Sequence, residues 1–158
     1  MSTPTFGQKE AGKNYIARYG VYAVIPNQDQ TKIILVQAPN GAWFLPGGEI
    51  EAGEDQLSAL KRELIEELGF EAELGNYYGQ ADEYFYSSHR DTYFYNPAYI
   101  YEAISYTAVD KPLEDFNNLV WFPVEEAISK LKRGSHKWGI EEWKKSHKSL
   151  WATTIFQK

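Results

Sequence analysis

The sequence predicts an α/β fold in which a mixed β-sheet is flanked by helices, forming an α/β/α sandwich. Short runs rich in Val, Ile and Tyr alternate with segments whose leucines recur at helical spacing, and this interleaving is typical of layered α/β domains. The 158 residues suit one domain and contain no internal repeat or linker-like tract. We therefore expect a single domain over residues 1–158, with residues 1–13 as a polar, loosely ordered lead-in.

The first strands are expected in the N-terminal third of the chain. Arg18 to Ile25 and Lys32 to Gln37 are rich in β-branched and aromatic residues, and the polar cluster 27–30 between them favours a turn. These segments therefore predict a β-hairpin. A third short strand, Trp43-Phe44-Leu45, follows the turn Pro39-Asn40-Gly41.

An amphipathic helix is expected next. Its leucines repeat at intervals of three and four residues, which places them on one helical face. Asp55 suits the N-cap, and Gly69 suits the left-handed residue that ends many helices. The leucines are Leu57, Leu60, Leu64 and Leu68.

The second half of the chain predicts three further strands and two helices. Phe70 to Tyr86 and Thr92 to Tyr106 are aromatic-rich strand candidates joined by a polar turn, and Leu119 to Phe122 is a last strand. Pro123 opens a helix running toward Arg133, and Ser135 to Lys148 forms another. We expect the tryptophans near the C-terminus to cap the sheet rather than to form a dimer contact; they are Trp138, Trp143 and Trp151. The oligomeric state, monomer or homodimer, stays open.

Composition and charge limit the class of function. The net charge of −6 disfavours binding to a nucleic acid polymer, which needs clustered Lys and Arg, but allows a nucleotide-sized substrate. The absence of cysteine excludes disulfides and thiolate metal sites, so any metal must bind oxygen or imidazole ligands. No apolar run approaches the roughly 20 residues needed to span a bilayer, and the N-terminus lacks a signal pattern. These features predict a cytoplasmic protein that does not associate with membranes.

Three carboxylates share one face of the expected helix. Glu63, Glu66 and Glu67 are three and four residues apart, so they occupy one arc of roughly 100° beside the leucine stripe. Such like charges repel unless a cation lies among them. All-oxygen ligation suits Mg²⁺, Mn²⁺ or Ca²⁺, and Mg²⁺ in particular combines a few carboxylates with substrate phosphates.

An acidic helical face alone is usually only a solvated surface, but a longer pattern surrounds this one. Five residues separate Gly48 from Glu54, and seven separate Glu54 from Arg62. The run Arg-Glu-Leu-Ile-Glu-Glu-Leu-Gly-Phe then extends unbroken from Arg62 to Phe70. At typical residue frequencies these nine positions would match by chance with a probability of about 10⁻⁹ per starting point. The pattern, preceded by Leu45-Pro46-Gly47-Gly48, resembles the complete signature of the Nudix (MutT-like) hydrolase family.

The resemblance implies the Nudix α/β/α fold and an Mg²⁺- or Mn²⁺-dependent reaction. Water would attack phosphorus in a nucleoside diphosphate linked to another group, which splits the anhydride. The residues with implied catalytic or metal-binding roles are Glu63, Glu66, Glu67 and Gly47. By the same resemblance, Glu66 and Glu67 bind the metal with the Gly47 carbonyl, and Glu63 is a further ligand or the base. Glu54 and Arg62 hold the loop and helix together by an ion pair.

One position departs from the family pattern. Many relatives carry another acid in the loop before the last strand, where this chain has Asn118. An amide is a poorer metal ligand than a carboxylate. Another acid would then complete the site, and the candidates are Glu114, Asp115, Glu83 and Glu102, with Glu114 ranked first.

Substrate choice is less constrained by the sequence. Adjacent glycines let the backbone approach a phosphate, so Gly48 is a candidate substrate contact. Tyr86 lies sixteen residues after Phe70, near the position of a Tyr common in relatives that act on dinucleoside polyphosphates, and it is a candidate for base stacking. Position 85 is Phe, which disfavours the ADP-ribose branch of the family.

Cationic residues supply further candidates for phosphate binding. Arg18 is the first, followed by His89 and Arg90. A later cluster is most simply explained as the polar face and end of a helix: Lys130, Lys132, Arg133, His136 and Lys137. Dinucleoside polyphosphates and non-standard nucleoside triphosphates are the leading substrates, and the alternative is a non-catalytic Nudix-fold nucleotide sensor or binding module.

Overall fold

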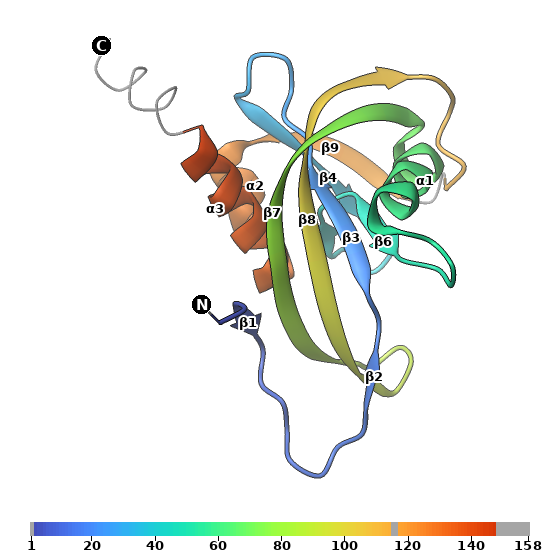
Figure 1. The fold of residues 1–158 in the computed structure, drawn as a ribbon, viewed down its shortest axis with the longest axis vertical. Helices are drawn as coiled ribbons and strands as arrows, with labels where there is room; N and C mark the ends of the chain where they lie inside the picture. The colour runs from blue at the N-terminus through green and yellow to red at the C-terminus, as the bar shows by residue number, and fades with distance from the viewer. Residues whose placement is uncertain (1, 115–116, 148–158) are drawn as a thin grey trace.

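The computed structural model describes residues 2–114 and 117–147 as a mixed α/β domain with two β-sheets and three helices (Figure 1). The strands are β1 (Thr5–Phe6), β2 (Tyr15–Ala17), β3 (Gly20–Val24), β4 (Lys32–Gln37), β5 (Trp43–Phe44), β6 (Gly47–Glu49), β7 (Phe70–Ser87), β8 (Thr92–Ala108) and β9 (Asn118–Pro123). The helices are α1 (Gln56–Leu68), α2 (Val124–Lys130) and α3 (Gly134–Ser146).

The larger sheet is mixed and is built around the long hairpin of β7 and β8. Its strand order is β1-β7-β8-β3-β6, and β2 also pairs with β8. β1 runs parallel to β7, and β2 and β3 run parallel to β8, whereas β3–β6 and β7–β8 are antiparallel. The smaller sheet has the order β5-β4-β9 and is antiparallel.

Helices cover both faces of the central strand β3 (Figure 1). Because successive side chains of a strand point to opposite faces, Val21 and Ala23 pack with Leu60 and Leu64 of α1, whereas Val24 belongs to the second core cluster. That second cluster contains Ala127 of α2 together with Ile140 and Trp143 of α3. The α/β/α expectation is therefore confirmed.

Helix α1 has the ends that the sequence predicts. The Asp55 carboxylate accepts the Ser58 backbone N–H at 2.7 Å, and Gly69 takes the left-handed conformation at φ 72°. Leu60, Leu64 and Leu68 are buried, but Leu57 is 45% exposed and does not belong to the buried stripe. The first turn of the helix therefore extends beyond the core.

The hairpin expected from segments 18–25 and 32–37 is wrong in its pairing. Both strands form, but β3 pairs with β8 and β6, and β4 pairs with β5 and β9. A single bridge, Pro26 to Ile33, joins the two strands beside their turn. Because both faces of β3 and β4 are buried, each strand has core to fill on two sides and enters a separate sheet.

The lead-in over residues 1–13 contains more order than expected. β1 pairs with Asp82 and Glu83 of β7, and the Phe6 ring lies so close to Gly134 that a Cβ there would sit 2.5 Å from it. The strand therefore supports the start of α3. Trp143 is buried in the core, which is consistent with sheet capping. Trp151 and Lys148, the expected end of the last helix, lie outside the described residues.

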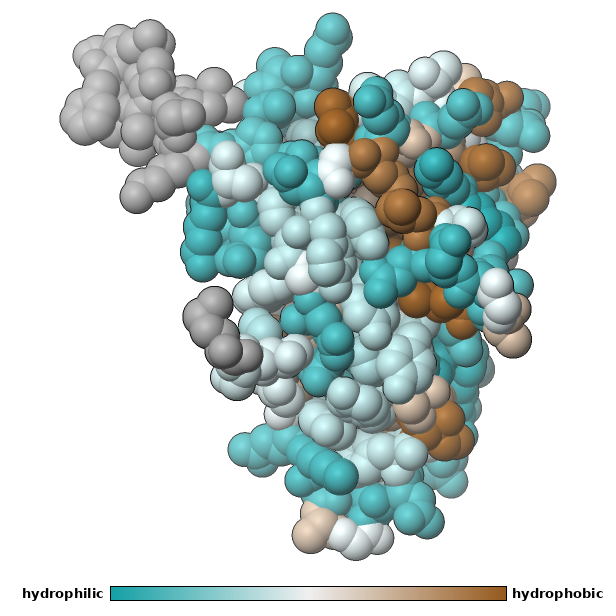
Figure 2. Space-filling model, viewed as in Figure 1, coloured by the Kyte–Doolittle hydropathy of each residue, from teal (hydrophilic) through white to brown (hydrophobic). Residues whose placement is uncertain are grey.

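The surface is uneven in hydropathy. In the view of Figure 2, hydrophobic residues gather mainly toward the side of α1. Among the described residues, no helix has the length and apolar character needed to cross a bilayer.

Gly69 offers a test of how α1 is ended. Its φ of 72° disfavours other residues, and an added Cβ would overlap the Asp110 carbonyl oxygen. We expect Gly69→Ala to lower the free energy of unfolding by about 1–3 kcal/mol, measured by urea denaturation. Gly12→Ala is the control, because Gly12 has a φ of 80° but open space around it. Equal losses in the two variants would contradict the steric account.

Candidate functional site

Two adjacent glycines bring the backbone of β6 against the acidic face of α1. Gly47 has a φ of 143°, and a Cβ there would overlap the Val21 carbonyl oxygen of the neighbouring strand. A Cβ on Gly48 would lie 2.5 Å from the Glu63 carboxyl carbon. Position 47 therefore requires glycine, whereas a side chain at position 48 would displace the Glu63 carboxylate, so the glycine there lets Glu63 lie directly on the strand.

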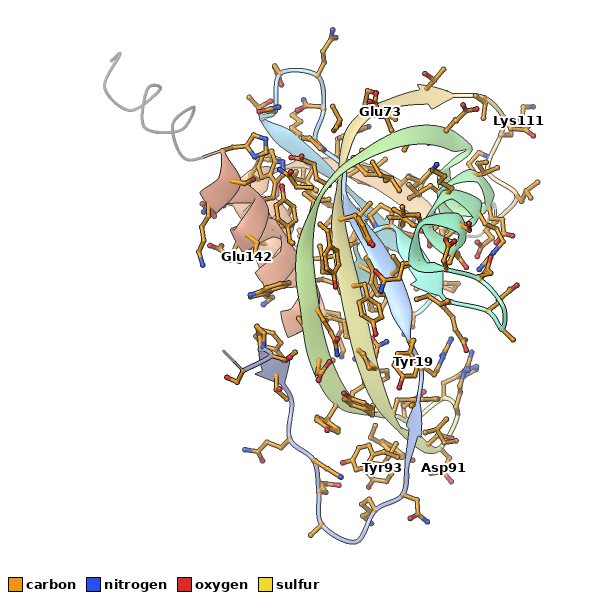
Figure 3. All side chains as sticks on the ribbon, in the orientation of Figure 1. Tyr19, Glu73, Asp91, Tyr93, Lys111 and Glu142 are labelled. Carbon is orange, nitrogen blue, oxygen red and sulfur yellow. The ribbon has the colours of Figure 1, made fainter. Side chains whose placement is uncertain are left out.

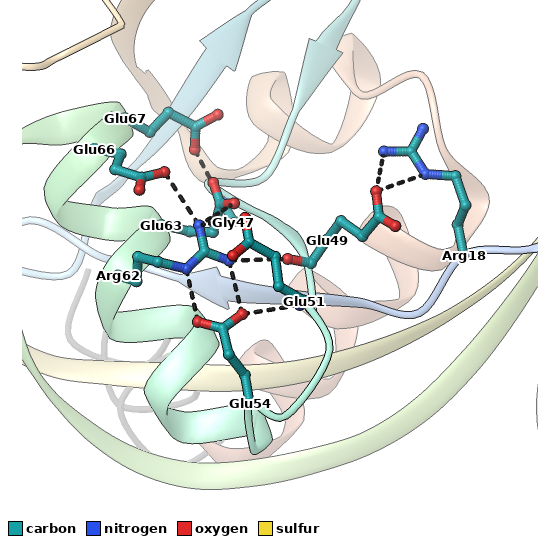
Figure 4. Close-up of polar contacts among 9 residues, drawn as sticks. All are labelled: Arg18, Gly47, Glu49, Glu51, Glu54, Arg62, Glu63, Glu66 and Glu67. Atoms are coloured by element: carbon teal, nitrogen blue, oxygen red, sulfur yellow. Dashed lines mark hydrogen bonds and ion pairs between the residues drawn. The ribbon is translucent and has the colours of Figure 1, made fainter.

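Arg62 connects the loop before α1 with the carboxylates on the helix (Figure 4). Its guanidinium donates to both Glu54 oxygens, at 2.7 and 2.9 Å, which confirms the expected ion pair. The same group donates to Glu63 at 3.0 Å, to Glu66 at 3.1 Å and to the Glu49 carbonyl at 3.1 Å. One planar cation thus orients two acids of the candidate site and holds the loop beside them.

Glu63 and Glu66 form a cluster of three carboxylates with Glu114. One oxygen from each of these residues lies within 4.8 Å of the others. Glu114 is brought there by the end of α1, because the Glu66 carbonyl accepts the N–H groups of Leu113 and Glu114 at 2.8 and 3.1 Å. A carbonyl in the last turn of a helix has no partner within the helix, so the Glu66 carbonyl can hold the loop.

The electrostatics of this cluster suit a cation. Burial raises the pKa of Glu63 to about 7 and that of Glu67 to about 8, although Arg62 opposes the shift of Glu63 and the Gly47 N–H that of Glu67. Burial also raises the pKa of Glu114, and the nearby Glu66 charge adds to the effect. Burial therefore disfavours the charged forms of these carboxylates, and a hard divalent ion would stabilise them.

Glu67 is placed differently from the other two helical acids. Its carboxylate accepts the Gly47 backbone N–H at 2.9 Å, and it is not part of the three-carboxylate cluster. Gly47 thus meets the acidic helix through its N–H. The metal-binding roles expected for Glu67 and for the Gly47 carbonyl stay predictions.

Of the four acids considered for the outer position, Glu114 is the one that the described structure brings to the cluster. Glu83 instead accepts the Ser135 N–H at the start of α3, at 2.9 Å. Glu102 accepts from Tyr78 at 3.0 Å and lies 3.2 Å from His147 Nε2 at the other end of α3. The structure therefore does not bring Glu83 or Glu102 to the cluster, because both acids contact the ends of α3. Asp115 lies outside the described residues.

A cavity of about 150 Å³ adjoins the acidic cluster through β6. Gly48 lines this cavity, and a Cβ on Gly48 would lie 2.5 Å from the Glu63 carboxyl carbon, so this residue of β6 borders both features. The cavity is lined by Arg18, Tyr19, Gly20, Tyr22, Phe44, Gly48, Glu49, Phe85, Asn96, Arg133 and His136. We call it the β6 pocket.

Arg133 and His136 face the β6 pocket, which differs from the exposed helical face expected for them. The Arg133 guanidinium lies 3.5 Å from the centre of the Phe85 ring. His136 is 1% exposed, and its Nδ1 accepts the Leu45 backbone N–H at 3.0 Å. The chain segment before α3 is anchored by the Lys132 N–H, which donates to the Trp43 carbonyl at 3.0 Å. The sequence carried no local sign of this contact between β5 and α3.

Arg18 and Tyr86, two expected substrate contacts, lie in different places. Arg18 lines the β6 pocket and forms an ion pair of 2.7 Å with Glu49. Tyr86 is 46% exposed, donates to Asp91 and packs on Tyr93. Figure 3 shows Asp91 and Tyr93 at the far end of the β7–β8 hairpin from α1. The structure therefore does not bring Tyr86 to the pocket, and its neighbour Phe85 lines the pocket instead.

His89 and Arg90 lie in the turn of the same hairpin, between β7 and β8. In Figure 1 this turn lies at the opposite end of the long strands from α1. The structure thus does not bring these two cations to the acidic cluster.

Comparison with known proteins agrees with this geometry. The family model described as "NUDIX domain" matches residues 17–144, which cover most of the chain and include the acidic helix and the β6 pocket. The chain belongs to the Nudix family.

Individual relatives agree on the family but differ in what they are named for. The chain is 47% identical to the CTP pyrophosphohydrolase of Escherichia coli over 62 residues, which cover 36% of this chain and 45% of that protein. It is 30% identical to the human diphosphoinositol polyphosphate phosphohydrolase NUDT4B over 112 residues, covering 67% of this chain and 58% of that protein. The matched stretches thus span about half of these curated relatives. The solution structure of the E. coli ORF135 protein has a TM-score of 0.59 and 26% identity, covering 82% of this chain and 89% of that one.

The acidic cluster makes a prediction about metal affinity. We expect Glu114→Gln to weaken Mn²⁺ binding by about tenfold or more, because even groups one shell further out change metal affinity about 10- to 100-fold. Isothermal titration calorimetry on the folded variant would measure this change. Glu126→Gln, an exposed acid on α2, is the matched control and should bind Mn²⁺ as the unaltered chain does. Unchanged affinity in Glu114→Gln would remove Glu114 from the site.

His136 makes a prediction about stability and pH. Burial, aided by the nearby Arg133 charge, lowers the pKa of His136 to about 3, whereas the unfolded chain protonates near 6.5. As the pH falls from 7 to 5, the unfolded state therefore gains a proton that the folded state does not, and this residue alone costs about 2 kcal/mol of stability. In His136→Asn that contribution should vanish, while the amide oxygen still accepts the Leu45 N–H. Urea denaturation at pH 7 and at pH 5 would measure this loss of stability in the unaltered chain and in His136→Asn. Equal losses in the two proteins would contradict a buried, neutral His136.

Proposed function

We propose that this protein is a divalent-metal-dependent hydrolase that cleaves a phosphoanhydride bond of a nucleotide. The observation that carries the proposal is the three-carboxylate cluster of Glu63, Glu66 and Glu114 directly beside the β6 pocket. The cluster has the all-oxygen donor set that Mg²⁺ and Mn²⁺ favour. The adjoining pocket offers a place for the organic part of the substrate.

The residues fit a divalent cation. Glu63, Glu66 and Glu114 would hold it, and a cation would stabilise the charged forms of Glu63 and Glu114, whose pKa values are raised by burial and by neighbouring carboxylates. When bound, the ion would offset phosphate charge and stabilise the charge that develops on the leaving oxygens.

The chain's own groups supply position and proton transfer. Arg62 holds Glu63 and Glu66 in place, and Arg18 at the rim of the pocket offers a cation to the phosphate chain. Water attacks phosphorus, and its proton passes to a carboxylate. Glu67 suits this acceptor role, because its carboxylate is held against β6 by the Gly47 N–H at 2.9 Å and does not belong to the three carboxylates that would hold the ion. Glu67 as a metal ligand is the alternative, and the two roles differ in their effect on metal affinity.

The pocket size bears on the substrate. At about 150 Å³ it has room for one heterocyclic ring rather than a whole nucleotide. This favours a nucleoside triphosphate, with its base in the pocket and its phosphates toward the acidic cluster. A dinucleoside polyphosphate is the second candidate, and the remote position of Tyr86 removes one reason for it. The intact acids of the signature argue against a non-catalytic binding module.

Substitution of Glu67 tests the proposal. With nucleoside triphosphates and Mg²⁺, the unaltered protein should release phosphate or pyrophosphate, and EDTA should stop the reaction. Glu67→Gln should lower kcat by about 10²- to 10⁴-fold, the usual contribution of a general base, while circular dichroism shows an unchanged fold. Unchanged Mn²⁺ affinity in this variant would identify Glu67 as the base, and a large loss would identify it as a ligand. Hydrolysis that persists in EDTA would contradict the proposed function.

A further inference from the structure

Two arginines line the β6 pocket, and one of them, Arg18, is paired with Glu49. The other is Arg133. With its guanidinium stacked on the Phe85 ring, the edge that carries its N–H groups stays free. Within residues 2–114 and 117–147, no carboxylate lies within 4.0 Å of this guanidinium. The nearby Glu83 instead accepts the Ser135 N–H. Arg133 thus presents a partly buried fork of donors.

His136 adds a second donor. A backbone N–H can only donate, so the bond from Leu45 requires a lone pair on Nδ1 and places the proton of the neutral ring on Nε2. Nε2 is buried, and it has no hydrogen-bond partner in the described part of the chain. A buried donor without a partner costs free energy, so a ligand that brings an acceptor within reach of Nε2 would recover that cost.

The other polar side chains of the pocket wall have partners that fix their orientation. The Glu49 carboxylate pairs with Arg18 at 2.7 Å. The Asn96 amide is oriented by its own donation to the Arg18 carbonyl at 2.6 Å. Tyr22 packs on His136 with ring centres 4.3 Å apart, and burial raises its pKa to about 12, so its hydroxyl keeps its proton. Among the described residues, Arg133 is therefore the charged side chain of the pocket wall without an ion-pair partner, and it meets a ligand as a donor.

We infer that Arg133 and His136 make the β6 pocket selective for bases that present carbonyl oxygens, as guanine and uracil do, over the amino-bearing adenine and cytosine. This inference rests on the proposed function. The arginine fork matches the O6 and N7 acceptors of guanine, whereas adenine places an amino group at the O6 position and opposes donor with donor. A site built to hydrogen-bond one edge rejects the mismatched base because its own buried donors lose their partners.

Matched substrate pairs test the inference, because each pair holds ring size constant. The measurement is kcat/KM with Mg²⁺ for GTP against ATP and for UTP against CTP. We expect GTP and UTP to be preferred by about tenfold to a hundredfold, the range of a good bidentate contact. The CTP measurement is a stringent one, because one similar protein is named as a CTP pyrophosphohydrolase, whereas the inference expects UTP to be preferred over CTP. Equal values within both pairs would overturn the inference.

Variants separate base selection from a merely structural role. In Arg133→Gln an amide that both donates and accepts replaces the fork, so the GTP-to-ATP ratio should fall to near one. Lys132→Gln removes the same charge from the adjacent exposed residue and should leave the ratio unchanged. A folded Arg133→Gln variant that keeps the preference would exclude Arg133 as its source. His136→Asn, which removes the Nε2 donor, should also lower the GTP-to-ATP ratio of kcat/KM.

Binding without turnover distinguishes this inference from the proposed function. Calorimetry of Glu67→Gln with GTP and with ATP, without added metal, measures the binding preference while turnover is suppressed. If no triphosphate is hydrolysed by the unaltered protein but GTP still binds more tightly than ATP, the proposed function fails and the base selectivity stands. Equal binding of GTP and ATP would contradict the inference even if the unaltered protein hydrolyses triphosphates.

Discussion

The site depends on the single cation of Arg62. Glu54, Glu63 and Glu66 all lie within hydrogen-bond distance of its guanidinium, as does the Glu49 carbonyl. Without that charge the carboxylates would repel one another, and the loop from β6 would lose its attachment to α1. Because Glu63 and Glu66 also belong to the three-carboxylate cluster, the interaction that stabilises the loop also positions the acids that would hold a metal.

The parts of the fold that depend on nearby residues could be predicted from the sequence. Helix α1 has both expected caps, since Asp55 and Gly69 act within a turn of the helix they delimit. The hairpin of β7 and β8 likewise follows from one polar turn. Strand pairing beyond such turns could not be predicted, and β3 joined β8 rather than β4, because partner choice depends on how two buried faces are filled by distant segments.

In the candidate site, too, the features set by nearby residues could be predicted, and those set by distant segments could not. The acids of α1 and their Arg62 partner were recognisable, because helical spacing fixes which side chains share a face. Phe85 was missed in favour of Tyr86, since adjacent strand residues point to opposite faces and a pattern of aromatics does not show which face meets the pocket. His136 looked like an exposed helical residue, and its burial follows from a contact with Leu45, ninety-one residues away in sequence.

The most direct test of the central claim is the position of the metal. Crystals grown with Mn²⁺ and examined at a wavelength where manganese scatters anomalously would locate the ion without reference to activity. Our account predicts the strongest peak among the carboxylates of Glu63, Glu66 and Glu114, with the Arg62–Glu54 pair still in place. A well-occupied Mn²⁺ site elsewhere, with no peak at this cluster, would contradict it.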